Sequence, residues 1–227
     1  MLRIGIVGVT GRLGKEVLAA CQADNSSEYV FGITSTKDKE NTALKIYNSF
    51  PDIPIDILID CSLPKALPIT IMEATKRKIP LLVLSTGHDS ISKNEYKIPV
   101  CFASNASFGV FVLNEAAKLI SKYVSQNAEI LIDETHHNQK KDSPSGTART
   151  IAENIKEASG YETQILSKRA GTVIGDHKIL FYLDGEHIEL THIAESRSLF
   201  GKGAIRLAHM LSKVREPKVY SIKELYG

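Results

Sequence analysis

The chain has 227 residues, of which 43% are hydrophobic and 24% are charged, and its formal net charge is +2. This length and composition predict a globular protein of one large domain or two small ones, and the absence of a basic block argues against nucleic-acid binding. No window has the apolar length of a membrane span, and the first residues do not resemble a signal peptide. Cys21, Cys61 and Cys101 lack metal-ligand spacing, so we expect reduced thiols and a cytoplasmic protein.

The first residues have the pattern of a strand, a glycine-rich turn and a helix. Residues 2–7 form an apolar run, and G-V-T-G-R-L-G at 8–14 precedes apolar residues at helical spacing. This pattern is typical of a dinucleotide-binding unit: Gly8 permits a tight turn, Gly11 admits a pyrophosphate, and Gly14 allows close packing of the helix on the strand. Because the spacing is G-x-x-G-x-x-G rather than G-x-G-x-x-G, a glycine turn without a ligand is the alternative.

The next segments continue the alternation of strands and helices. Such alternation predicts a parallel, doubly wound sheet, in which ligands bind beyond the carboxyl ends of the strands. Three loops of small residues follow predicted strands, at 8–14, 85–87 and 103–107. We expect these loops to form one nucleotide site. The predicted strands are 29–34, 55–60, 80–85 and 99–103, with a helix from about 64 to 76.

The end of the second predicted strand bears on the choice of cofactor. An NAD-binding unit usually has an acidic residue there to accept from the ribose hydroxyls. This chain has Thr34, Ser35, Thr36 and Lys37, which would accept a 2′-phosphate. We therefore expect NADPH to be used at least as well as NADH, unless Asp38 is the residue that faces the ribose.

The second half contains adjacent histidines at the end of a predicted strand. Residues 108–124 predict a helix, and residues 128–137 alternate as a strand that ends in His136 and His137. Neighbouring side chains on a strand point to opposite faces, so this pair is a poor metal site, and we expect no metal. A structural role for one histidine is the alternative to proton transfer, for which histidine and the nearby Lys140 are suited.

A helix is predicted from D-S-P-S-G-T-A at 142–148 to about residue 157. Pro144 suits the start of a helix, and Gly146 and Thr147 leave backbone N–H groups uncovered. Such an N-terminus can bind a carboxylate. A capped surface helix would explain this segment equally well, but it would not explain H-H-N-Q-K before it.

The remaining segments predict a hairpin and a closing helix. Residues 176–184 and 186–195 read as strands that turn at 184–185 and fit an antiparallel sheet, whose surface could form a subunit interface. Residues 196–211 predict the closing helix, and 218–227 could add a last strand and turn to the first domain.

These motifs together resemble one family. The most specific is E-x-H-H-x-x-K-x-D-x-P-S-G-T-A at 134–148, supported by the glycine turn, S-T-G at 85–87, A-S-N-A-S-F-G at 103–109, K-R-A-G at 168–171 and H-I-A-E-S-R-S-L-F-G-K-G-A at 192–204. Over essentially its whole length the chain resembles the 4-hydroxy-tetrahydrodipicolinate reductase family, also called dihydrodipicolinate reductase. The departures, at Leu84, Ala106, Phe111 and Ser35, all lie on the cofactor side.

The resemblance implies an α/β fold with two domains. A Rossmann-like dinucleotide-binding domain would comprise 1–107 and 198–227, and an α+β substrate-binding and oligomerisation domain with a mixed sheet would comprise 108–197. The family is usually a homotetramer. It reduces a cyclic dicarboxylate, 4-hydroxy-tetrahydrodipicolinate, with a hydride from NADPH or NADH in lysine and diaminopimelate biosynthesis.

The resemblance also implies residue roles. His136 and Lys140 would donate protons, His137 would contact the substrate, and Gly146 and Thr147 would bind its carboxylate. Together with the ribose-side residues, the predicted cofactor-binding residues are Gly8, Val9, Thr10, Gly11, Arg12, Leu13, Ser35, Lys37, Ser85, Thr86, Ala103, Ser104, Asn105 and Ala106.

Two other functions fit parts of the pattern. A different two-domain reductase, such as one acting on an amino-acid semialdehyde, would not need the H-H-x-x-K and S-G-T residues together. An inactive NADPH sensor would have lost its proton donors, yet His136 and Lys140 are present. Because the substrate and nicotinamide residues fall in different domains, we also expect domain closure, with hinges near Ser107 and Ser198.

Overall fold

The described residues form two compact units. The computed structural model describes residues 1–36, 41, 43–87, 95–124 and 128–227. One unit comprises Met1–Ser107 and Ser198–Gly227, and the other comprises Phe108–Arg197. Among the helices of these ranges, none has both the length and the apolar character that crossing a membrane requires.

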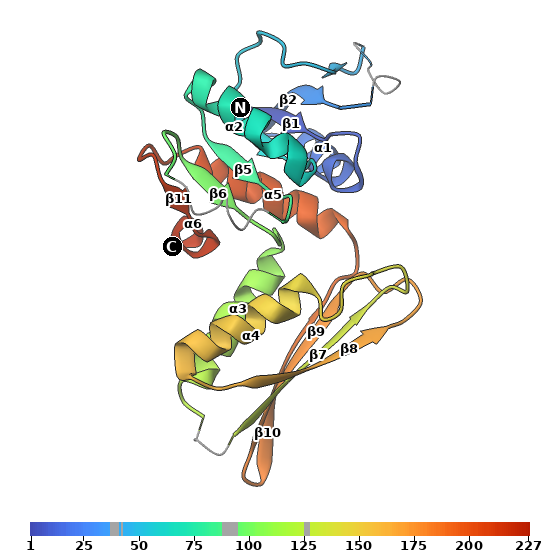
Figure 1. Ribbon diagram of the computed structural model, residues 1–227, viewed down its shortest axis with the longest axis vertical. Coiled ribbons are helices and arrows are strands. Elements are labelled where there is room, and N and C mark those ends of the chain that lie inside the picture. The colour runs from blue at the N-terminus through green and yellow to red at the C-terminus, as the bar shows by residue number, and fades with distance from the viewer. Residues whose placement is uncertain (37–40, 42, 88–94, 125–127) are drawn as a thin grey trace. The chain divides into compact units, whose positions relative to one another are not determined.

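The first unit is built on a parallel sheet (Figure 1). In the described part of the chain it has seven strands, and every pair of neighbours runs parallel. The central strands β1, β4 and β5 are mostly apolar and mostly buried, as expected of a sheet that is covered on both faces. Their order is β11 (Val219–Tyr220), β6 (Val100–Phe102), β5 (Leu81–Val83), β4 (Ile57–Asp60), β1 (Leu2–Val7), β2 (Ser27–Ile33) and β3 (Ile46–Tyr47).

Helices cover both faces of this sheet. On one face, α1 (Arg12–Ala23) and α5 (Ser198–Leu211) pack with β1 and β4 in one apolar cluster, which includes Val17 and Ala204. On the other face, a 3₁₀ turn (Pro64–Ala66) leads into α2 (Leu67–Arg77), which packs with β2 and β5 in a second cluster. The short α6 (Ile222–Tyr226) follows β11 and begins with a capping box between Ser221 and Glu224.

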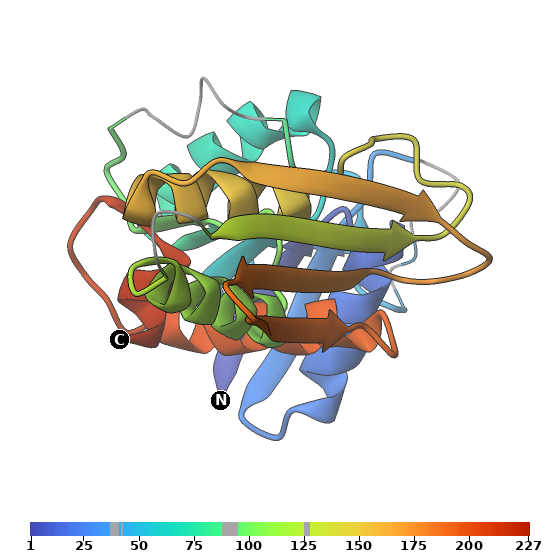
Figure 2. The ribbon, with the colours of Figure 1, turned by 90° about the horizontal axis from the view of Figure 1, so that it is seen from below.

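The second unit has a mixed sheet with two helices. Its strands in the described residues follow the order β10 (Glu186–Ile193), β9 (Asp176–Leu183), β7 (Glu129–His136) and β8 (Thr163–Arg169), as Figure 2 shows. The pair β7–β8 is parallel, while β7–β9 and β9–β10 are antiparallel. Both α3 (Phe108–Ser121) and α4 (Gly146–Ser159) contribute to one apolar core with β7 and β9.

This architecture confirms the predicted fold class, with corrections in detail. The sheet of the second unit is mixed, as predicted, but β8, which pairs in parallel with β7, was not among the predicted strands. The predicted last strand and turn are a two-residue strand and the helix α6. The strand β3 was not predicted, since its two residues carry no period. Helix α4 begins at Gly146, so Pro144 lies before the N-cap residue Ser145 rather than inside the first turn.

Candidate active site

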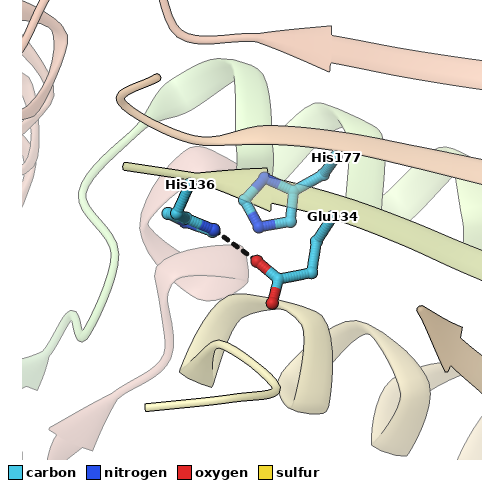
Figure 3. A group of neighbouring side chains, drawn as sticks. All are labelled: Glu134, His136 and His177. Atoms are coloured by element: carbon cyan, nitrogen blue, oxygen red, sulfur yellow. Dashed lines mark ion pairs between the residues drawn. The ribbon is translucent and has the colours of Figure 1, made fainter. Parts of the chain in front are cut away.

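A buried group of Glu134, His136 and His177 lies in the mixed sheet (Figure 3). Glu134 and His136 are two residues apart on β7, so the strand's alternation turns both toward the same buried face. His177 lies directly opposite Glu134 in the antiparallel pairing of β7 and β9. The exposed fractions of Glu134, His136 and His177 are 0%, 8% and 3%.

The carboxylate of Glu134 has a defined set of partners. Its Oε2 forms an ion pair with Nδ1 of His136. Its Oε1 accepts from Nη1 of Arg169 (3.1 Å) and from the backbone N–H of Ser145 (3.2 Å). Burial acts to raise the pKa of Glu134, but the hydroxyl of Ser167 together with these charges and donors outweighs it and leaves the pKa below its ordinary value. Glu134 is therefore a charged carboxylate inside the sheet.

The two histidines differ in environment. Burial lowers the pKa of His136, and the charges of Lys140 and Arg169 lower it further, while Glu134 acts to raise it. Burial lowers the pKa of His177 to about 4, so this ring is neutral at neutral pH. The rings meet edge to face with centroids 5.2 Å apart, and Nε2 of His177 lies 3.4 Å from Oγ of Ser145.

Arg169 connects the loop that carries Lys140 to the sheet. From the end of β8, its Nη2 donates to the carbonyl of Asp142 (2.5 Å) and its Nε to the carbonyl of Lys140 (3.4 Å). Within the loop, Nζ of the half-buried Lys140 donates to Oδ1 of Asp142 (2.8 Å). Partial burial acts to raise the pKa of Asp142, but Lys140 and backbone N–H groups hold it below its ordinary value.

Helix α4 begins beside this group. Ser145 is its N-cap residue, and the Oγ of Ser145 accepts from the backbone N–H of Ala148 (3.1 Å). A Cβ added at Gly146 would meet no heavy atom within 4 Å, so a ligand can approach this backbone closely. Thr147 is half-buried in the same turn. His137 is half-buried beyond the end of β7 and does not belong to the Glu134–His136–His177 group.

The residue types of this group could also hold a metal ion. Each of Glu134, His136 and His177 offers one ligand atom, and these atoms lie within 4.8 Å of one another. At the level of sequence, only the adjacent pair His136 and His137 was a candidate for metal binding, and not this combination. However, Oε1 of Glu134 already accepts from Arg169, a fixed cation that disfavours a second one. The absence of a metal stays a prediction.

The glycine turn of the first unit has the backbone that a dinucleotide requires. Gly8 has φ +77°, which favours glycine. A Cβ at Gly14 would lie 2.2 Å from the carbonyl oxygen of Gly8, so only glycine lets α1 pack this closely on the turn. The N-cap residue Gly11 has no side chain to cap α1, Arg12 is exposed beside it, and the side chains of Val9 and Leu13 pack into the apolar core. A phosphate would fit at this helix N-terminus.

The predicted ribose side is only partly described. The hydroxyls of Thr10 and Thr34 are 3.0 Å apart, which ties the glycine turn to the end of β2. Ser35 is exposed immediately after this point. Lys37 and Asp38, on which the cofactor argument depends, lie outside the described residues.

The predicted nicotinamide loops follow β5 and β6. Ser85 donates to Oδ1 of the buried Asp60 at the end of β4 (3.1 Å). The side chains of Ala103 and Ala106 are buried in the apolar core, so these residues could contact a cofactor only through their backbone. The side chain of Asn105 accepts from the backbone N–H of Ser107 (2.9 Å). Thr86 and Ser104 are exposed.

Four residues in or next to the buried group were given no role at the level of sequence: Glu134, Arg169, His177 and Ser145. Glu134 could have been found, because it lies two residues before His136 on a predicted strand. Arg169 stands in the K-R-A-G motif, but the strand that carries it was not predicted. His177 gave no signal, and Ser145 stood in the P-S-G-T-A motif without a role of its own, since only the strand register and the helix start bring these two residues to Glu134.

The fold and the site together define a class of protein. A parallel sheet with this glycine turn is a dinucleotide-binding domain, and the second sheet carries a buried carboxylate–histidine pair beside a lysine, as expected of a two-domain NAD(P)H-dependent oxidoreductase. Residues 2–106 match "Dihydrodipicolinate reductase, N-terminus", and residues 109–226 match "Dihydrodipicolinate reductase, C-terminus". The chain thus belongs to the dihydrodipicolinate reductase family.

Individual relatives agree with this membership. The chain is 33% identical over 252 residues to a 4-hydroxy-tetrahydrodipicolinate reductase of Campylobacter jejuni, with 100% of both chains covered. It is 34% identical over 233 residues to the reductase of the same name from Bdellovibrio bacteriovorus, covering 100% of this chain and 97% of the relative. Among solved structures, the dipicolinate-bound dihydrodipicolinate reductase of Paenisporosarcina sp. TG-14 has a TM-score of 0.78 at 20% identity, with 99% and 98% covered.

Proposed function

We propose that this chain carries out its family's reaction with His136 and Lys140 as proton donors. The reaction is the NAD(P)H-dependent reduction of 4-hydroxy-tetrahydrodipicolinate to tetrahydrodipicolinate and water in lysine biosynthesis. It consumes one hydride and one proton, and the hydroxyl group of the substrate leaves as water. The residue roles are supported by the position of His136 at the buried end of β7, against Glu134, with the Lys140 loop bound to the same strands by Arg169.

The first unit, Met1–Ser107 with Ser198–Gly227, would be the dinucleotide-binding domain. Bound NADPH or NADH supplies the hydride. The turn from Gly8 to Leu13 would receive the pyrophosphate at the start of α1, where Gly11 leaves the helix without a side-chain cap. Neutral Thr34 and Ser35 at the end of β2 favour NADPH at least as much as NADH.

The second unit, Phe108–Arg197, would bind the cyclic dicarboxylate. The N-terminus of α4 at Gly146 and Thr147 suits a carboxylate, because backbone N–H groups and the helix dipole converge there. His137 would contact the same substrate. His136 and Lys140 would deliver a proton to it, since both come from the loop and strand that precede this helix.

The second unit would also form a homotetramer through its sheet. Large apolar side chains are exposed on three of its strands, which favours burial against another copy. These are Leu166, Tyr182, Ile188 and Ile193. Sedimentation velocity would measure the assembly, and a monomer at micromolar concentration would contradict this part of the proposal.

A coupled assay tests the proposed function. The unstable substrate is generated in place from pyruvate and aspartate semialdehyde by the preceding synthase, and oxidation is followed at matched NADH and NADPH concentrations. We expect turnover with both cofactors. A folded protein that binds a nicotinamide cofactor but reduces no substrate would overturn the proposal.

The same assay tests Lys140 against its neighbour. We expect Lys140→Gln to lower kcat at least about a hundredfold, the range for loss of a proton donor, while NADPH still binds. Lys141→Gln is the matched control, because Lys141 is the adjacent lysine and is exposed. Equal activity of the two variants would exclude Lys140 as a proton donor.

A further inference from the structure

Glu134 has no role in the mechanism as given so far, although it is the acidic residue in contact with His136. We propose that Glu134 is a positioning residue, which holds Nδ1 of His136 and leaves Nε2 as the nitrogen that delivers the proton. This inference rests on the proposed function of His136 as a proton donor.

The position of Glu134 allows this role without any movement of the backbone. Because the two residues are two apart on β7, their side chains leave the strand on the same face, and Oε2 of Glu134 faces Nδ1 of His136 (Figure 3). Glu134 is fully buried, so water does not compete for its oxygen. An imidazole whose Nδ1–H donates to a carboxylate is fixed in ring orientation and in tautomer.

The other end of the ring is bounded by main chain. A Cβ added at Gly175 would lie 3.0 Å from Nε2 of His136, so the ring passes close to this glycine. His177 closes another side with its ring edge to face. The position of the His136 ring is therefore set by Glu134, Gly175 and His177, and of these Glu134 has the charge.

The negative charge of Glu134 also acts on the pKa of His136, which it raises. Among the described residues, the ionisable groups that act on His136 are Glu134, Lys140 and Arg169, with the neutral His177 in ring contact. Burial, Lys140 and Arg169 all disfavour the imidazolium form. Glu134 is the anion of this set, and its charge keeps the proton-carrying form accessible.

The two carboxylate oxygens of Glu134 have different partners, so its proposed positioning role can be tested apart from its structural role. Oε1 accepts from Arg169 and Ser145, which stabilises the loop and the start of α4. Oε2 faces His136. Glu134→Gln can keep the acceptor at Oε1 while it replaces Oε2 with an amide NH₂, which donates and carries no charge. This variant thus removes the proposed function of Glu134 and spares the structural one.

We expect Glu134→Gln to lower kcat at pH 7.5 by at least about tenfold, with little change in KM. Since the anion that favours imidazolium is gone, the acid form of His136 persists only at lower pH, and the pH profile of kcat should shift to lower pH. Activity should recover partly on acidification. Asp133→Asn is the control, because Asp133 is the neighbouring acid on β7 and faces the other way toward Lys168.

A spectroscopic measurement on the unmodified enzyme makes the test independent of how Glu134→Gln folds. With ¹⁵N-labelled histidine, the neutral His136 signal, assigned by its loss in His136→Gln, should report a proton on Nδ1. A neutral tautomer with its proton on Nε2 would overturn the inference. The inference would also be overturned if Glu134→Gln had the same kcat and the same pH profile as the wild-type enzyme.

The outcomes also distinguish this inference from the proposed function. If His136→Gln keeps wild-type turnover, the role of His136 as proton donor fails, and the positioning role of Glu134 fails with it. If His136→Gln loses turnover while Glu134→Gln does not, the inference about Glu134 alone is wrong.

Discussion

At the scale of single residues, the site depends on how tightly one ring is held. By position alone His136 would seldom carry a second proton at neutral pH, because burial and two cations lower its pKa. As a proton donor it would depend on the carboxylate at Nδ1 and on the absence of a side chain at Gly175. A proton donor that is misplaced by a fraction of an ångström loses much of its effect on the rate.

Gly175→Ala should therefore impair catalysis although it replaces no ionisable group. The new methyl group would lie 3.0 Å from Nε2 and 3.3 Å from Cδ2 of His136, so the ring must move away from its position against Glu134. We expect kcat to fall by about tenfold, as a small misplacement of a catalytic group predicts. Steady-state kinetics measure this, and NADPH binding serves as the control because Gly175 lies in the second unit. Unchanged kcat would show that the ring does not need this position.

At the scale of secondary-structure elements, the strands on either side of β7 supply residues to the site. The antiparallel strand β9 brings His177 opposite Glu134, and the parallel strand β8 brings Arg169 opposite His136. The sheet thereby buries a neutral imidazole next to a charged carboxylate. Such burial makes the stability of this sheet depend on pH.

The pH dependence due to His177 has a definite sign. The pKa of His177 is about 4 in the folded protein and 6.5 ordinarily, so between these values the unfolded chain binds more protons. Stability should fall as the pH is lowered from about 6.5 to about 4, by up to about 1.4 kcal/mol per pH unit. Urea unfolding at pH 7, 5.5 and 4.5 measures this slope.

A pair of variants tests whether the burial of His177 causes this dependence of stability on pH. His177→Gln should flatten the dependence, although His136 will leave part of it. His187→Gln removes an exposed histidine of β10 and should leave the slope unchanged. Equal slopes in the wild-type protein and in His177→Gln would contradict the assignment.

At the scale of the whole molecule, the chain passes twice between its two compact units. The crossings fall between Ser107 and Phe108 and between Arg197 and Ser198. The proposed cofactor residues belong to one unit and the proposed substrate residues to the other. Hydride transfer requires the two to meet, so binding of both ligands should favour a closed arrangement.

Small-angle X-ray scattering tests this closure. We expect the radius of gyration to decrease when NADPH and a dicarboxylate inhibitor are added together, because each ligand would contact a different unit and only the pair would bridge them. NADPH alone is the control and should produce a smaller change. Identical profiles with and without both ligands would count against closure.

Much of this protein could be predicted because the signals are local. The alternation of β7, the helical spacing after the glycine turn and the need for glycine at φ +77° in Gly8 follow from the covalent chain and short-range sterics. The 134–148 motif likewise placed His136, Lys140 and the start of α4 in one continuous segment. Local patterns therefore determined the class of fold, the family and the candidate proton donors.

Only the tertiary structure decided how these residues are held. Strand order and register are set by contacts between segments far apart in the chain, and no local period predicts them. Those contacts place Arg169 of β8 on Glu134, set His177 of β9 opposite it, and turn the side chains of Ala103 and Ala106 into the core. The sequence by itself determined which residues can carry the chemistry. The folded structure decided which carboxylate faces His136, because the burial and pairing of a charge depend on the whole sheet.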